Sequence, residues 1–234
     1  MSLVLCIETT STNCSVALAV ENGGFANKYG VLNCLDVLED NSDAYSHGER
    51  LHVYIKDILA RNNFSTKDLD AVAVSEGPGS YTGLRIGVAS AKGLCYALEI
   101  PMIAISTLKS LSKQNTASGI TIAMLDARRM EVYGSVFHGD DQVQNVSAIL
   151  LDGESFSQFR APEEKGLILD RKVTFIGTGV EKFRALIKEE QHLYITSNPT
   201  ALTICDLAIE KFKIKDTEDV AYFEPFYLKE FKAG

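Results

Sequence analysis

Three short segments place polar side chains where a phosphate or a metal ion could bind. The first, residues 7–18 (IETTSTNCSVAL), has Glu8 at the end of an apolar run and Thr9 and Thr10 in the polar turn that follows. Carboxylate and hydroxyl oxygens suit Mg²⁺ and its phosphate ligand. The pattern predicts a phosphate loop, although a plain hairpin with a Thr/Ser-rich turn fits the same residues.

The second segment, residues 76–94 (EGPGSYTGLRIGVASAKGL), places a glycine turn before a predicted helix. Free N–H groups at a helix start can hold an anion. Gly83, Gly87, Ser90 and Leu94 share one face, because residues three or four apart are neighbours on a helix. Small residues there favour close packing over phosphate binding. We predict that the helix beginning near Tyr81 meets another subunit through this stripe, unless the stripe packs inside its own lobe.

The third segment places Gly177, Thr178 and Gly179 between a predicted strand and a predicted helix. Glycines allow the backbone to approach a flat base such as adenine, and they also make an ordinary turn between a strand and a helix. Together with Glu8, this turn leaves open weak binding of ATP or ADP with Mg²⁺. The alternative hypothesis is therefore a small ATPase or phosphotransferase.

The four histidines do not predict a metal site. His47 and His52 are five residues apart, which separates them by roughly 140° around a helix, so one ion could not use both. His138 and His192 are isolated in the sequence, and we expect a surface or capping role for each histidine. The five cysteines are scattered, as expected of buried apolar side chains in a reducing compartment.

Peptidase chemistry is not indicated. The sequence contains no G-x-S-x-G elbow and no H-E-x-x-H helix. Ser80 follows the glycine turn, but a serine nucleophile needs a base and none can be identified beside it. We therefore predict no catalytic residue.

Composition limits the partners of this chain. Its 234 residues carry a net charge of −8, which argues against a nucleic-acid binder working alone. The basic pairs Arg128-Arg129 and Arg171-Lys172 are too small to overturn that expectation, so RNA contact is expected through a partner. The N-terminus lacks the features of a secretion signal, and the longest apolar stretch is interrupted by charges and a proline. We expect a cytoplasmic protein without a membrane anchor.

The expected elements form two α/β lobes, residues 1–105 and 106–234, with the last helix packing back on the first lobe. A strand ending in an acidic residue, a polar turn and a return strand occur near the start of the chain and again at residues 120–137. This weak repeat indicates two related halves. The first lobe is expected to contain, in order, strands at 3–8, 15–20 and 25–32, a helix over 48–61, a strand at 69–75, a helix to Ala97 and a strand at 101–105.

Six motifs in the same order resemble the bacterial TsaB family, also called YeaZ. They run from the first strand to the C-terminus, so the resemblance covers essentially the whole chain. The motifs are IETTSTNCSVAL (7–18), HGERL (47–51), GPGSYTGLRIGVASAKGL (77–94), STLKSL (106–111), LDARRMEVY (125–133) and PFYLK (225–229).

The resemblance implies a duplicated actin-like ATPase (ribonuclease-H-like) fold with two lobes. It implies a role in tRNA N6-threonylcarbamoyladenosine formation as the non-catalytic partner of a TsaD-type transferase, which a TsaE-type ATPase joins. We also expect tRNA contact through the complex, and the sequence leaves open a monomer or a homodimer when the chain is alone. The superfamily's first phosphate loop has Asp and glycine where this chain has Glu8 and Thr9-Thr10, which weakens the ATPase alternative.

Overall fold

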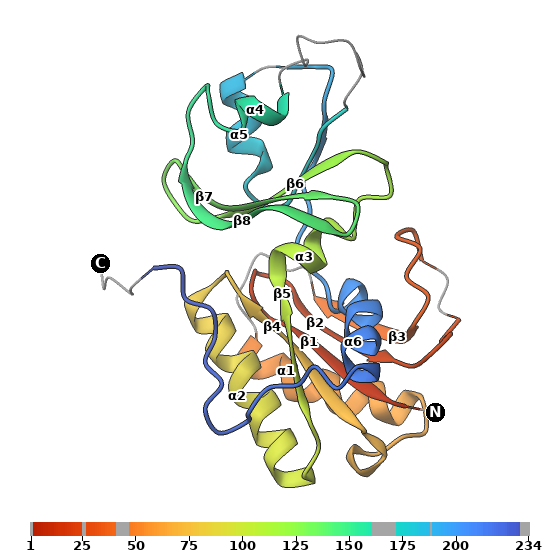
Figure 1. Cartoon of the computed structure of the whole chain (residues 1–234). Helices are drawn as coiled ribbons and strands as arrows, with labels where there is room; N and C mark the ends of the chain where they lie inside the picture. Colours follow the sequence, from red (N-terminus) through yellow and green to blue (C-terminus); the bar gives the residue numbers. More distant parts are fainter. Residues whose placement is uncertain (1, 25–26, 41–46, 161–171, 188, 230–234) are drawn as a thin grey trace. The chain divides into compact units, whose positions relative to one another are not determined.

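The chain folds into two compact units in the computed structural model (Figure 1). The structure describes residues 2–24, 27–40, 47–160, 172–187 and 189–229. Unit 1 comprises Met1–Ser110 and Asn198–Gly234, and unit 2 comprises Leu111–Ser197. The boundary between the lobes was expected after residue 105. The observed division falls after Ser110, and the chain returns to unit 1 at Asn198 because the last helix buries its apolar face there.

Unit 1 is built on a five-stranded mixed sheet of order β3-β2-β1-β4-β5. The pairs β1–β2 and β2–β3 are antiparallel, whereas β1–β4 and β4–β5 are parallel. Glu8 at the end of β1 pairs with Ser15 of β2. The strands are β1 (Val4–Glu8), β2 (Cys14–Ala19), β3 (Cys34–Asp40), β4 (Ala71–Gly77) and β5 (Met102–Ser106).

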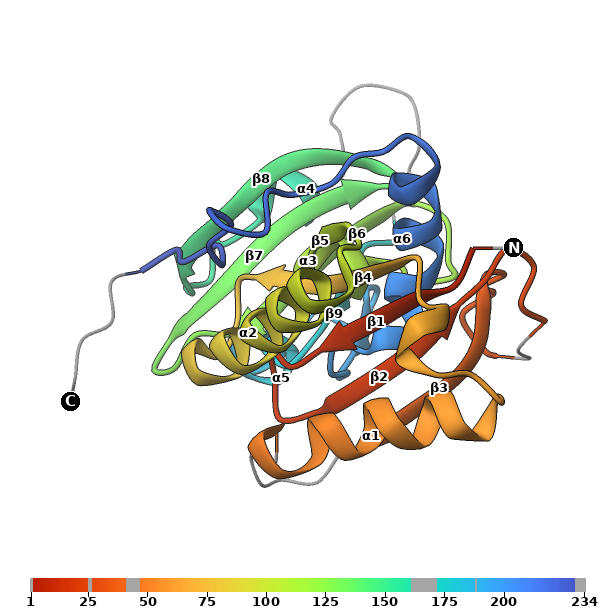
Figure 2. The same cartoon turned by 90° about the horizontal axis from the view of Figure 1, so that it is seen from below.

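Helices cover both faces of this sheet, which is why β1 is buried along its whole length. Alternate side chains of a strand point to opposite faces. Leu5 and Ile7 pack in the apolar core under α1 (His47–Arg61) and α2 (Tyr81–Leu98), which lie on the same face (Figure 2). Val4 and Cys6 face α6 (Ile204–Lys213) in a second apolar cluster. The short helices of this unit are η1 (Thr66–Asp68) and η2 (Ala201–Thr203), while α3 (Thr107–Ser112) spans the boundary between the units.

Unit 2 repeats the same strand order around a second core. Its sheet runs β10-β9-β6-β7-β8, with β6–β7 and β7–β8 antiparallel and β6–β9 and β9–β10 parallel. Phe156, Phe175 and Phe183 are in mutual ring contact in its interior. The elements are β6 (Ile120–Asp126), β7 (Glu131–His138), β8 (Asp141–Leu150), α4 (Ser157–Arg160), β9 (Thr174–Ile176), α5 (Val180–Ile187) and β10 (Leu193–Ile195).

The two sheets correspond strand for strand. In each, a central strand pairs antiparallel with the strand that follows it and parallel with a strand that comes later in the chain. β6 therefore occupies in unit 2 the position that β1 occupies in unit 1. The architecture predicted from the sequence, two related α/β halves, is confirmed.

The third strand of unit 1 was predicted at the wrong residues. It was expected at 25–32, whereas β3 begins at Cys34. Asn27 explains the difference, because its Oδ1 accepts hydrogen bonds from the backbone N–H groups of Tyr29 (3.0 Å) and Val31 (3.2 Å). Such local bonds compete with strand pairing. Phe25 and Ala26 lie outside the described residues. The polar stretch 154–166, with one proline, predicts a surface loop. Residues 161–166 of this stretch also lie outside the described residues, and its described part includes α4.

Candidate functional site

The predicted phosphate loop is the tight turn between β1 and β2, and its polar groups bond to one another. Glu8, Thr9 and Thr10 are 0%, 2% and 3% exposed. The Glu8 carboxylate accepts hydrogen bonds from Thr10 N (2.6 Å), Thr10 Oγ1 (2.5 Å) and the Ser75 hydroxyl. Burial raises the pKa of this carboxyl group, and the hydrogen bonds oppose that rise. The group that was expected to face Mg²⁺ is thus engaged inside the unit.

The start of α2 packs directly on this turn. Thr9 Oγ1 donates to the Gly83 carbonyl at 2.8 Å, and Ser80 N donates to the Thr10 carbonyl at 2.7 Å. A Cβ atom at Gly83 would lie 1.9 Å from Thr9 O, and one at Gly87 would lie 2.3 Å from Thr9 Oγ1. Only glycine fits at these two positions, because the turn approaches the helix so closely that any side chain would clash with it.

The predicted interface stripe is therefore not one exposed surface. Gly83 and Gly87 are buried against the turn between β1 and β2 of the same unit. For these two residues, the alternative that the stripe packs inside its own lobe therefore holds. Ser90 is half-buried, with Oγ donating to Ile86 O at 2.8 Å, and Leu94 packs at the edge of the core between α2 and the sheet. The face of α2 that is open to solvent consists of Thr82, Arg85, Ala89, Gly93, Tyr96 and Ala97.

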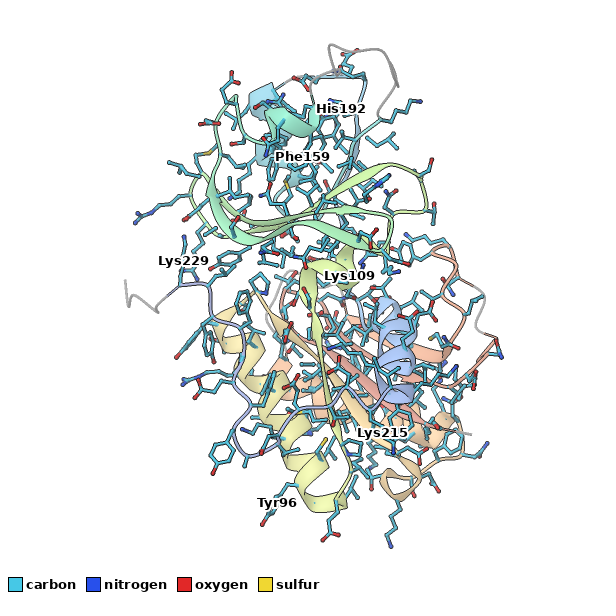
Figure 3. The ribbon with its side chains drawn as sticks, viewed as in Figure 1. Tyr96, Lys109, Phe159, His192, Lys215 and Lys229 are labelled. Carbon is cyan, nitrogen blue, oxygen red and sulfur yellow. The ribbon has the colours of Figure 1, made fainter. Side chains whose placement is uncertain are left out.

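Tyr96 is the most prominent side chain on that open face. It is 83% exposed and extends away from the ribbon (Figure 3). No atom outside the helix lies within 4 Å of a Cβ built at Gly93, one turn earlier. An apolar ring beside small residues on an uncovered helix face is the arrangement that a second helix could pack against.

The histidines have separate environments. Nε2 of His47 lies 2.8 Å from the Ser11 carbonyl, and burial lowers the pKa of this imidazole. His52 is exposed on α1, with Nε2 3.4 Å from Ser90 Oγ. In unit 2, His192 is buried, and its Nε2 lies 3.0 Å from Glu189 Oε2.

The expectation of a surface role is thus wrong for His47 and His192, because both side chains are buried, at 2% and 5% exposed. His138 at the end of β7 is exposed, as expected. Among the side chains that the structure describes, no group of three or more His, Cys, Asp or Glu is arranged to hold a metal ion.

The predicted adenosine turn in unit 2 is closely packed on β6. A Cβ at Gly177 would lie 2.1 Å from Met124 O, and Gly177 has φ +125°, a conformation that favours glycine. Gly179 N donates to the same carbonyl at 3.2 Å, while Thr178 Oγ1 accepts from Asp126 N at 3.0 Å. These contacts favour the interpretation as an ordinary turn between a strand and a helix.

A C-terminal strap, residues 218–229, lies along β4, β5 and α2 in unit 1 (Figure 1). Phe226 N donates to Glu76 O at 2.8 Å, and Lys92 Nζ donates to Phe223 O at 3.0 Å. The Tyr227 ring lies 5.3 Å from that of Tyr81 at the start of α2. The PFYLK motif thus braces the helix that carries the open face.

Comparison with known proteins gives consistent results. A family model described as "TsaD: tRNA N6-adenosine threonylcarbamoyltransferase" matches residues 42–233. The tRNA threonylcarbamoyladenosine biosynthesis protein TsaB of Escherichia coli K12 is 31% identical over 236 residues, which cover 97% of this chain and 94% of that protein. The TsaB protein of Haemophilus influenzae is 28% identical over 97% of this chain and 93% of its own length.

The fold has a solved counterpart. The structure of YeaZ from Pseudomonas aeruginosa matches with a TM-score of 0.71 and 25% identity, covering 97% of this chain and all of that chain. The duplicated actin-like α/β fold expected from the sequence is confirmed by this match and by the paired sheet topology.

Proposed function

Because this chain belongs to the TsaB family, we propose that it acts in tRNA threonylcarbamoyladenosine biosynthesis as a non-catalytic subunit that binds a TsaD-type transferase. The observation that carries the proposal is the 31% identity to a TsaB protein along 97% of the chain. The site geometry is compatible with a supporting role, since Glu8, Thr9 and Thr10 bond to their own unit rather than forming an open cleft. The complex would work in the cytoplasm, with a TsaE-type ATPase as third member. None of the helices among the described residues is long and apolar enough to cross a bilayer.

The surface proposed to meet the TsaD-type paralogue is the open face of α2. It contains the exposed ring of Tyr96 beside Ala89 and Gly93, and the C-terminal strap fixes the helix from one side. Small residues let two helix backbones approach closely, which increases dispersion contact. In the absence of the paralogue, a second copy of the chain would use the same face.

Reconstitution tests the function. The chain, a TsaD-type paralogue, a TsaE-type ATPase, the threonylcarbamoyl donor and unmodified tRNA are combined, and modified adenosine is measured with each protein omitted in turn. Omission of this chain is expected to abolish turnover, and the chain alone is expected to transfer nothing. Equal turnover without the chain would contradict the proposal, and so would transfer by the chain alone.

A substitution on α2 tests the surface. Ala89→Arg places a long charged side chain in the open face, so co-purification with the paralogue should be lost while the thermal melt stays unchanged. Glu210→Arg is the matched control, because Glu210 is an exposed residue of α6 on the other face of the sheet. Retained pairing in the Ala89 variant would exclude this face. The arginine belongs at Ala89 and not at Gly87, because Gly87 is buried against Thr9.

A further inference from the structure

The hairpin between β6 and β7 ends in two consecutive arginines with an unusual backbone. The arginine tip, residues 127–130, has φ +68° at Arg128 and φ +50° at Arg129. Residues with a side chain rarely adopt this left-handed region, because Cβ comes too close to the following carbonyl oxygen. Seven non-glycine residues with positive φ occur in the described part of the chain, and these two are the only adjacent pair among them.

The strained backbone is held by surrounding hydrogen bonds. Ala127 N donates to Glu131 O at 3.0 Å, and Glu131 N donates to Arg128 O at 3.2 Å. Arg128 N donates to Asp126 Oδ1 at 2.6 Å. Strain of this kind persists only where neighbouring contacts over-determine the conformation.

Lys182 of α5 supplies the remaining support. Its Nζ donates to Asp126 Oδ1 (2.8 Å), Arg129 O (2.8 Å) and Glu131 O (2.9 Å). The lysine charge is balanced by Asp126 in this arrangement, and its side chain is only 16% exposed. Among the residues that the structure describes, the two tip arginines have no acid in an ion pair with them.

Both arginine side chains are exposed. Within the part of the chain that the structure describes, neither guanidinium forms a salt bridge or a hydrogen bond, and neither stacks on a ring. Several other exposed basic residues do have acidic partners, as in Arg61–Asp36 and Lys213–Glu21. In a chain of net charge −8, two adjacent guanidiniums on a fixed turn thus have no acidic partner among the described residues.

We infer that the arginine tip contacts backbone phosphates of the RNA substrate, an inference that rests on the proposed function in tRNA modification. The guanidinium fork matches phosphate oxygens in pairs. An acidic protein attracts RNA only where positive charge is local and unpaired, and the tip provides that condition. Because the turn is fixed, the arginine Cα positions need not be ordered when RNA binds.

The test replaces the arginines without removing the turn. Arg128→Asn with Arg129→Asn suits the purpose, because asparagine tolerates the left-handed region. The matched control is Lys67→Asn with Lys215→Asn, which also removes two exposed positive charges. Lys215 has φ +57°, so one control position has the same backbone conformation as the tip.

Binding of an unmodified tRNA transcript is measured from 50 to 300 mM salt, for the full chain and for its complex with the TsaD-type paralogue. The arginine variant should melt at or above the wild-type temperature and bind tRNA roughly tenfold more weakly at the lowest salt. The slope of log affinity against log salt should shrink by about 1–2, because each lost phosphate contact removes close to one unit. The lysine control should change much less.

Equal affinity and equal slope for the arginine variant and the lysine control would overturn the inference. If the arginine variant binds tRNA normally but no longer co-purifies with the paralogue, an acidic protein surface is the occupant and the RNA assignment is wrong. If only this inference is wrong, the reconstituted reaction still requires this chain. Failure of the proposed function appears separately, as tRNA modification without the chain.

Discussion

Replacing Gly83 with alanine should destabilise unit 1, although alanine is the better helix former. A Cβ at this position would lie 1.9 Å from the Thr9 carbonyl oxygen, whereas real Cβ contacts below 3.0 Å essentially never occur. The turn or the helix must therefore move by about 1 Å. Overpacking of this kind costs about 1–3 kcal/mol.

Two smaller contributions modify that estimate. Displacing the turn weakens the hydrogen bond from Thr9 Oγ1 to Gly83 O, which contributes about 1 kcal/mol. The change from glycine to alanine within a helix stabilises by about 1 kcal/mol. The two contributions nearly cancel, so we expect a net loss of about 1–3 kcal/mol in the free energy of unfolding.

Gly93→Ala is the internal control for this experiment. Gly93 is in the same helix, and an added Cβ there meets nothing within 4 Å outside the helix. It should therefore show only the gain of up to about 1 kcal/mol from helix propensity. Urea unfolding followed by circular dichroism measures the stability of both variants. If the free energy of unfolding falls by ~2 kcal/mol per M of urea, the midpoint of the Gly83 variant should lie roughly 0.5–1.5 M below that of the wild type. A Gly83 variant as stable as the Gly93 variant would refute the argument from close packing.

Three further predictions follow from particular side chains. Glu8→Gln should remove a pH dependence of stability. Because burial raises the Glu8 pKa, the folded state holds this proton to higher pH than the unfolded chain does. The stability of the wild type relative to the variant should therefore fall as the pH rises from about 4.5. A difference in urea midpoints that does not change with pH would contradict this. Lys182→Met should lower the free energy of unfolding by about 1–2 kcal/mol and speed amide hydrogen exchange at Ala127 and Glu131, because Asp126 and two backbone carbonyls lose their donor. Unchanged exchange rates would exclude a role of Lys182 in holding the arginine tip. Tyr227→Ala should make the C-terminal strap more sensitive to protease by removing about 1 kcal/mol of ring contact with Tyr81, whereas Tyr222→Ala, at a residue 84% exposed in the same strap, should leave cleavage unchanged.

The sequence predicted the elements and the fold because the apolar patterns are strong. The runs that became β1, β4 and β6 are continuous and buried, and the helix over 48–61 was placed within one residue of α1. The error at the third strand came from Asn27, whose side chain competes with the backbone ladder. The effect of that competition depends on tertiary contacts and could not be judged from residue types.

The candidate site was harder to predict, because the same residues suit two geometries. Thr9 and Gly83 fit an open phosphate loop or a closed contact, and only the 2.8 Å bond between them decides for the closed contact. Likewise, small residues at Gly83 and Gly87 indicated close approach but not by which element. Arg128 and Arg129 were judged too few to predict RNA binding. A sequence does not show that their backbone is left-handed and that their charges have no partner among the described residues.

The division of unit 1 between the two ends of the chain has a consequence for synthesis on the ribosome. Residues Leu111–Ser197 are contiguous, so unit 2 can fold as soon as it has emerged. Unit 1 cannot, because the helix that covers Val4 and Cys6 is α6, which is made only after all of unit 2. The strands of unit 1 must therefore wait with one apolar face uncovered until α6 has been made. Unit 1 is thus completed after unit 2, although its first strands are made earlier, and nascent chains halted before Ile204 should depend on chaperones for solubility.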